Sequence, residues 1–179
     1  MARQDPQARR EAILEAAADL VVESGPNRLT HRRVAERAGV PLGSTTAYFT
    51  SIDDLRTQAL EKLAAEIDAD LAIVERGLAD SQGSIETLVE QMHEYLTDGR
   101  KVAADVSLMS AAAFDPDLRE LSLRWQNRLI EILTAYVGPD NALGLAVLAD
   151  GVTVHAALHG TAISKTTLHT IVAPFMAQE

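Results

Sequence analysis

The sequence is 179 residues long, and its 47% apolar and 23% charged residues are typical of a globular protein rather than a disordered chain. It contains no cysteine, which excludes disulfide bonds and thiolate metal sites. The first residues lack the apolar core of a signal peptide, and the most apolar segment, residues 142–149, is too short to cross a membrane. We therefore expect a soluble cytoplasmic protein with no membrane partner.

The formal net charge of −10 argues at first against a nucleic-acid partner. The charge is unevenly distributed, however. Residues 1–50 contain seven arginines and six acidic residues, a net charge of +1, whereas the remaining 129 residues carry a net charge of −11. This asymmetry suggests two functional parts, although an acidic surface is by itself usually just a solvated one.

Helical spacing of apolar residues runs through the whole chain, and no segment alternates for long enough to predict a β-strand. The expected helices are 9–24, a short one between Thr30 and Gly39, 42–49, Ser51 to Asp80, Ser84 to Asp98, 100–114, Asp115 to Gly138, 140–160 and 165–177. The sequence thus predicts an all-α fold of about nine helices.

Local signals mark the ends of the first three helices. Gly25, Pro26 and Asn27 end the first, because proline cannot continue a helix. The Thr30 hydroxyl can cap the second helix by accepting a hydrogen bond from a free N–H group of its first turn. Gly39 supplies the positive φ of a tight turn. Val40 is expected to pack in the angle between the helix that ends at Gly39 and the helix at 42–49.

Residues 29–49 therefore have the form of a helix-turn-helix, in which the helix at 42–49 would enter the major groove of DNA. Its small and hydroxyl-bearing residues suit phosphate oxygens and the methyl group of thymine. Three further candidates begin the preceding helix, and Arg32 among them is the best placed to form a bidentate contact with guanine. The expected DNA contacts are Thr30, His31, Arg32, Arg33, Gly43, Ser44, Thr45, Thr46 and Tyr48.

Ordered matches over about 45 residues give this segment a specific resemblance. The matching residues are Ile13-Leu14-Glu15-Ala16-Ala17, Gly25, Leu29-Thr30, Val34-Ala35-Glu36-Arg37-Ala38-Gly39-Val40, Gly43-Ser44, Tyr48-Phe49 and Asp54-Leu55. The segment resembles the DNA-binding domain of the TetR family of transcriptional regulators. Two positions depart from that pattern: Thr46 replaces a tyrosine that contacts phosphate, and Ile52 replaces a lysine. Arg56 is a candidate substitute for that lysine.

The resemblance implies a helix-turn-helix DNA-binding domain at residues 1–52 and a helical ligand-binding and dimerisation domain at residues 53–179. It implies a homodimer formed through the last two helices and a small-molecule effector held among helices four to eight. The candidate pocket residues are Met92, Asp105, Met109, Phe114 and Trp125. For each apolar one taken singly, ordinary core is the preferred interpretation, and Asp105 is better read as a solvated carboxylate.

His155 and His159 are four residues apart on one helical face and could present two metal ligands. No third ligand is evident, so hydrogen-bonded interface histidines are the preferred reading, and we expect no metal and no cofactor. No arrangement of nucleophile and base is supported by spacing, so we do not expect an enzyme.

The sequence favours a repressor that a small molecule releases from a palindromic operator. The alternatives are a ligand-independent DNA-binding module and a small helical metalloenzyme built on His155 and His159. The effector, the operator sequence, the regulated genes and the sign of regulation cannot be read from the sequence.

Overall fold

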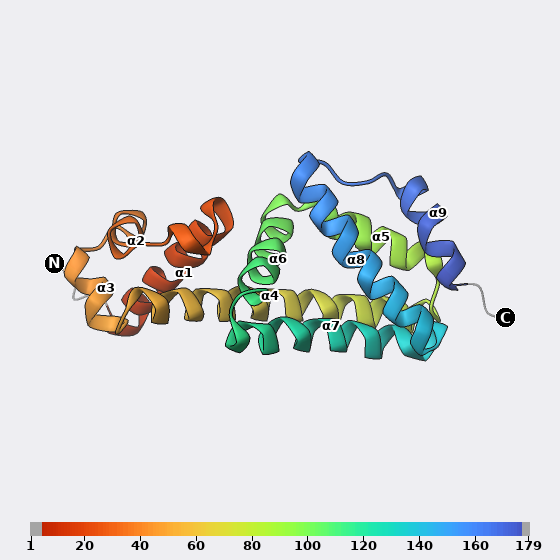
Figure 1. Ribbon diagram of the computed structural model, residues 1–179, viewed down its shortest axis with the longest axis horizontal. Coiled ribbons are helices and arrows are strands. Elements are labelled where there is room, and N and C mark those ends of the chain that lie inside the picture. Colours follow the sequence, from red (N-terminus) through yellow and green to blue (C-terminus); the bar gives the residue numbers. More distant parts are fainter. Residues whose placement is uncertain (1–4, 177–179) are drawn as a thin grey trace. The chain divides into compact units, whose positions relative to one another are not determined.

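The computed structural model describes residues 5–176, which form nine α-helices and one short 3-10 helix, with no β-strand among them (Figure 1). The α-helices are α1 (Pro6–Ser24), α2 (His31–Ala38), α3 (Leu42–Tyr48), α4 (Ile52–Asp80), α5 (Ile85–Thr97), α6 (Gly99–Ala112), α7 (Pro116–Val137), α8 (Pro139–His159) and α9 (Lys165–Met176). The 3-10 helix η1 covers Pro26–Arg28. The predicted all-α fold is confirmed, and the sixth helix ends two residues earlier than expected.

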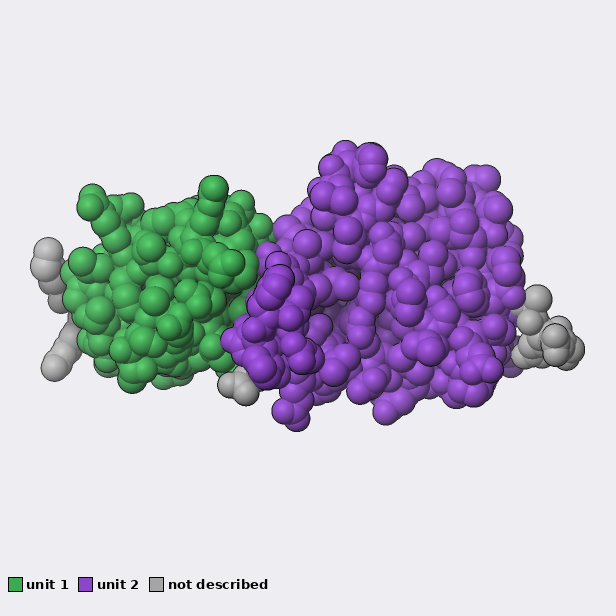
Figure 2. All heavy atoms as spheres, in the orientation of Figure 1, with its two compact units in different colours: residues 1–63 green, residues 64–179 purple. Residues whose placement is uncertain are grey.

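The chain forms two compact units, residues 1–63 and 64–179 (Figure 2). Helix α4 contributes residues 52–63 to the first unit and residues 64–80 to the second. The domain boundary expected after residue 52 lies at the first turn of α4, whereas the units divide eleven residues further along this helix. One helix is therefore shared by both units.

The first unit has a small apolar core built from α1 to α4. Ile13, Val21, Val34, Phe49 and Leu55 are each no more than 1% exposed. The cap predicted at Thr30 is present at α2, and α4 has a cap of the same kind. Thr30 Oγ1 accepts a hydrogen bond from the backbone N–H of Arg33, and Ser51 Oγ accepts one from that of Asp54. These bonds satisfy first-turn donors that have no partner inside the helix.

The second unit is a bundle of α5 to α9 with the later turns of α4. Helix α8 packs against α5, α6, α7 and α9, and α6 packs against α7. Helix α7 runs beside α4, where Arg124 pairs with Asp68 and Arg128 pairs with Glu75 (Figure 1). The shared core contains side chains from every one of these helices, including Leu78, Leu88, Leu145, Leu168 and Val172.

Helix α8 is more apolar than the sequence analysis anticipated. The helix is long and apolar enough to cross a membrane by length and composition alone, and its most apolar 18-residue window has a mean hydropathy of 1.4. Polar residues such as Asp150 and His155 interrupt it, so its uninterrupted apolar stretches remain short, as expected. In the structure α8 packs within the helical bundle, yet only 33% of that apolar window is buried. A large apolar surface of α8 is consequently left uncovered by this chain.

Candidate functional site

The turn between α2 and α3 has the geometry that the sequence predicts. Gly39 adopts the left-handed conformation, with φ of 64° and ψ of 32°, and closes α2. The next residue, Val40, is half-buried and donates its backbone N–H to the carbonyl oxygen of Ala35 at 3.0 Å. A residue with a Cβ atom is strained at this φ, so glycine makes the sharp turn accessible. The chain then reverses directly into α3.

Helix α3 presents one narrow exposed face. Gly43 and Thr46 are exposed, and Ser44 and Tyr48 are half-buried. Thr45 is fully buried, and its hydroxyl donates to the carbonyl oxygen of Leu42 at 2.8 Å. The expectation that Thr45 is exposed is therefore wrong, because its hydroxyl serves the helix itself and its side chain packs inside the unit.

The three candidates at the start of α2 differ in how free they are. The Arg32 side chain is 83% exposed and makes one ion pair, from its Nε to Glu36 Oε1 at 3.1 Å. Arg33 is committed within the unit, because its guanidinium donates to the carbonyl oxygen of Arg28 at 2.7 Å and to Ser24 Oγ at 3.1 Å. His31 is half-buried, and its Nδ1 has no hydrogen-bond partner among the described residues. Arg32 is therefore the long cation best able to reach outward.

The two positions that depart from the TetR pattern can now be placed. Thr46 is exposed and donates its hydroxyl to the carbonyl oxygen of Gly43 at 3.2 Å, so it remains a short polar group on the α3 surface. Ile52 is half-buried. The candidate substitute Arg56 is already engaged, since it donates to the carbonyl oxygen of Pro26 and to Asp53 Oδ1.

The second unit contains a cavity of about 80 Å³ between α4, α5, α7 and α8. Its walls are mainly leucine, valine and alanine, with a few polar and aromatic groups. The lining residues are Asp70, Leu71, Val74, Leu88, Gln91, Met92, Tyr95, Leu96, Trp125, Leu129, Leu133, Leu145, Ala149, Val152 and Thr153. Met92 and Trp125, two of the expected pocket residues, are among them.

The other three expected pocket residues lie elsewhere. Phe114 follows the end of α6 and is 89% exposed, so its assignment as a pocket wall is wrong. Met109 is half-buried and does not line the cavity. Asp105 is only 2% exposed, which contradicts its reading as a solvated carboxylate. It lies behind the cavity wall, where its Oδ2 accepts a hydrogen bond from the hydroxyl of Tyr95 at 3.3 Å.

Asp105 has an acidic neighbour. The pKa of Asp105 is raised to about 7, first by burial and then by the charge of Asp150, while the hydrogen bond from Tyr95 opposes both effects. Burial also raises the pKa of Asp150, whose carboxylate accepts a hydrogen bond from Gln126. The other oxygen of Asp150, Oδ1, is buried and has no hydrogen-bond partner among the described residues. Asp105 is therefore a buried carboxyl group with a half-buried acidic neighbour.

The two histidines of α8 do not form a metal centre within the described residues. No group of three histidine, cysteine or acidic side chains that could hold a metal ion occurs in residues 5–176. His155 and His159 are both exposed, and their rings stack with their centroids 4.1 Å apart.

Comparisons with known proteins agree with these features. A family model described as "Bacterial regulatory proteins, tetR family" matches residues 13–59. A solved structure of a transcriptional regulator from Streptomyces coelicolor A3(2) is 32% identical and has a TM-score of 0.76, covering 95% of this chain and 99% of that chain. This chain belongs to the TetR family of transcriptional regulators, which bind DNA.

Two other members extend the comparison. The HTH-type transcriptional regulator BetI of Escherichia coli is 25% identical over 95% of this chain and 93% of BetI. The multidrug binding protein EbrR, solved in complex with imidazole, is 29% identical with a TM-score of 0.78, and the match covers 96% of each chain. EbrR has also been solved with malachite green, proflavin and ethidium.

The structure adds cavity residues that sequence reasoning missed. Asp70 lies beside the unbroken apolar stripe of α4, and Gln91 and Tyr95 lie on the α5 face that carries Met92. An acidic residue beside such a stripe is usually solvated, so the local sequence gives no signal for Asp70. Its partner, Lys101, lies 31 residues away in sequence, and no local pattern reveals it.

Proposed function

We propose that this TetR-family protein is a homodimeric repressor that a small molecule releases from a palindromic operator. The observation that carries the DNA-binding part is the exposed face of α3, which follows the left-handed turn at Gly39 and bears Gly43 and Thr46. Small side chains let a helix backbone approach base edges closely in the major groove. Arg32 extends the same surface with a cation, and Thr30, Ser44 and Tyr48 complete it with hydroxyl groups.

Homodimerisation is supported by the uncovered face of α8. Leu143, Val147, Val154 and Leu158 are between 39% and 80% exposed, and they recur at the three- and four-residue spacing of a helical seam. Gly151 continues this row and is exposed, which lets a second helix approach closely. An apolar stripe of this kind is a protein-interaction surface, and a second copy with the same stripe would cover it by two-fold symmetry.

Effector binding is supported by the cavity and by the relatives. Asp70, Leu71 and Val74 of α4 line the cavity, and the first turns of the same helix belong to the DNA-binding unit. An effector that binds more tightly to one arrangement of α4 shifts the equilibrium toward it. EbrR, whose structures contain four different small molecules, shows that a protein of similar sequence takes ligands. A ligand-independent module would need no such cavity. A repressor of this kind acts on chromosomal DNA, so we assign it to the cytoplasm.

Selection of random DNA duplexes by the purified protein tests the proposal. The expected result is a palindromic consensus whose half-sites are about one helical turn, roughly 34 Å, apart. Sedimentation of the free protein should give the mass of two chains. Enrichment of no duplex, or a monomer on a non-palindromic site, contradicts the proposed function.

A further inference from the structure

The cavity lining carries a negative charge. Asp70 is the only charged side chain among the lining residues, and it is an acid. Tyr95 and Trp125 add aromatic faces, which attract cations. Gln91 donates its amide to the carbonyl oxygen of Ile73 at 3.2 Å, while its Oε1 is buried without a hydrogen-bond partner among the described residues. The cavity thus offers a carboxylate, aromatic faces and a free acceptor.

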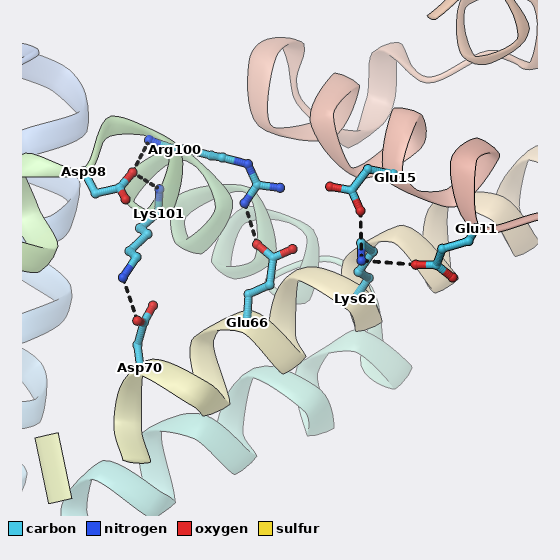
Figure 3. Close-up of polar contacts among 8 residues, drawn as sticks. All are labelled: Glu11, Glu15, Lys62, Glu66, Asp70, Asp98, Arg100 and Lys101. Carbon is cyan, nitrogen blue, oxygen red and sulfur yellow. Dashed lines mark hydrogen bonds and ion pairs between the residues drawn. The ribbon is translucent and has the colours of Figure 1, made fainter. Parts of the chain in front are cut away.

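A cation from outside the cavity already uses two of these groups. Lys101 lies on α6 and is not a lining residue. Its Nζ donates to Asp70 Oδ1 at 2.6 Å and lies 5.9 Å from the centroid of the Tyr95 ring (Figure 3). The carboxylate of Asp70 is largely buried, since its side chain is only 19% exposed, whereas that of Lys101 is 38% exposed. The lysine therefore reaches the acid from the solvent side.

We propose that Lys101 is a built-in substitute for the charged group of the effector, and that the effector is a small aromatic organic cation which displaces Lys101 from Asp70 and Tyr95. This inference rests on the proposed function, because it identifies the class of molecule that the regulator senses. An ammonium group with an aromatic body would give its charge to Asp70, an N–H to Gln91 Oε1 and its ring to the apolar walls. A neutral molecule of the same shape would leave the Lys101 pair intact and gain none of the charge contacts.

The size of the cavity fits a displacement mechanism. A volume of about 80 Å³ is smaller than the 150 Å³ or so that holds a benzene ring, so an aromatic ligand must push side chains aside. Met92, Trp125 and Lys101 are partly exposed side chains, so each has room to move. Withdrawal of Lys101 frees the Asp70 carboxylate at the cavity wall, where the new charge must lie.

Displacement of Lys101 would also loosen α6 from α4. Asp98 caps α6, because its Oδ1 accepts hydrogen bonds from the backbone N–H groups of Arg100 and Lys101 at 3.0 and 3.1 Å. The side chains of these two residues then pair with Glu66 and Asp70, which are one turn apart on α4 (Figure 3). Loss of the Lys101 pair removes one of these two ion pairs. The next turn of the same α4 face carries Lys62, which pairs with Glu11 and Glu15 of α1.

The test compares two probes of nearly equal shape, 2-naphthylmethylammonium and neutral 2-naphthylmethanol, by fluorescence titration of the full chain without DNA. Lys101→Met should bind the ammonium about fivefold more tightly than wild type, because the competing cation is gone. Lys101→Arg restores the competitor and should bind like wild type. Lys165→Met is the matched control, because it removes an equivalent ion pair, with Glu90, outside the cavity.

Asp70→Asn provides the opposite test and should weaken ammonium binding about tenfold while leaving the alcohol unchanged. Unfolding curves of each variant show that it is folded. The proposal is overturned if Lys101→Met binds the ammonium no more tightly than Lys165→Met does, or if its affinity for the alcohol rises by the same factor. It is also overturned if neither wild type nor Lys101→Met binds the ammonium at millimolar concentrations of the probe. Since no DNA is present, a failed operator selection refutes the repressor proposal without changing this affinity order.

Discussion

The two units differ in whether they bury a carboxyl group. Among the described residues of the first unit, Thr45 is the buried polar side chain, and its hydroxyl is satisfied by the carbonyl oxygen of Leu42. The second unit buries Asp105 close to Asp150, and one oxygen of Asp150 has no partner among the described residues. No carboxyl group is buried among the described residues of the first unit. The second unit contains unfavourable charge that a proton or a cation can relieve.

The largest expected effect concerns the core of the first unit. Phe49 is 1% exposed and has the guanidinium of Arg10 5.2 Å from its ring centroid. Phe49→Ala should lower the free energy of unfolding by about 3–5 kcal/mol, through lost burial and the cavity left behind. Phe114→Ala is the matched control, and at an 89% exposed site it should change stability by less than about 0.5 kcal/mol. Urea unfolding followed by circular dichroism measures both, and equal losses would contradict the assigned core.

The second prediction concerns the pH dependence of stability. The pKa of Asp105 is about 7 in the folded protein and near 3.8 in an unfolded chain, so the folded state retains a proton that the unfolded state releases. Stability should therefore fall as the pH rises through this window. Asp105→Asn removes this dependence and keeps an acceptor for Tyr95. Between about pH 4 and pH 8, the free energy of unfolding of the wild type should fall by up to about 4 kcal/mol relative to that of the variant. Parallel pH profiles would show that the carboxyl group of Asp105 is ionised in the folded protein throughout.

The third prediction separates DNA binding from stability. Arg32→Ala should weaken operator binding by about 1–3 kcal/mol and relax the preference for guanine at one position. Its ion pair with Glu36 is exposed at both ends, so the stability of the protein should hardly change. Arg128→Ala makes the same charge change in the second unit and should leave operator affinity at the wild-type value. Equal binding by both variants in moderate salt would remove Arg32 from the DNA interface.

The smallest expected effect is the loss of a helix cap. Thr30→Ala leaves the backbone N–H of Arg33 without its side-chain acceptor and should destabilise α2 by about 1 kcal/mol. Hydrogen exchange of the Arg33 amide should accelerate, with Thr166→Ala in α9 as the control. An unchanged exchange rate would mean that water replaces the cap at no cost.

Features that depend on residues close in sequence were predicted correctly, whereas features that depend on packing between distant helices were not. The cap at Thr30, the turn at Gly39 and the start of α4 were predicted correctly, because each depends on residues within one turn of helix. The burial of Thr45 was not predicted, since the rotation of a seven-residue helix is set by packing against other helices. Asp105 and Phe114 were misplaced for the same reason, as their exposure depends on helices distant in sequence.

The central claim is that the exposed face of α3 contacts operator DNA, and Thr46→Glu tests it most directly. The change places a negative charge on an exposed position of α3, with Thr166→Glu in α9 as the charge-matched control. The affinity of each protein for a selected duplex is measured by fluorescence anisotropy. Thr46→Glu should bind about ten- to hundredfold more weakly than wild type, through repulsion of phosphate and loss of close approach. Wild-type affinity of Thr46→Glu, or an equal loss in Thr166→Glu, would contradict the assignment of α3 as the DNA-reading helix.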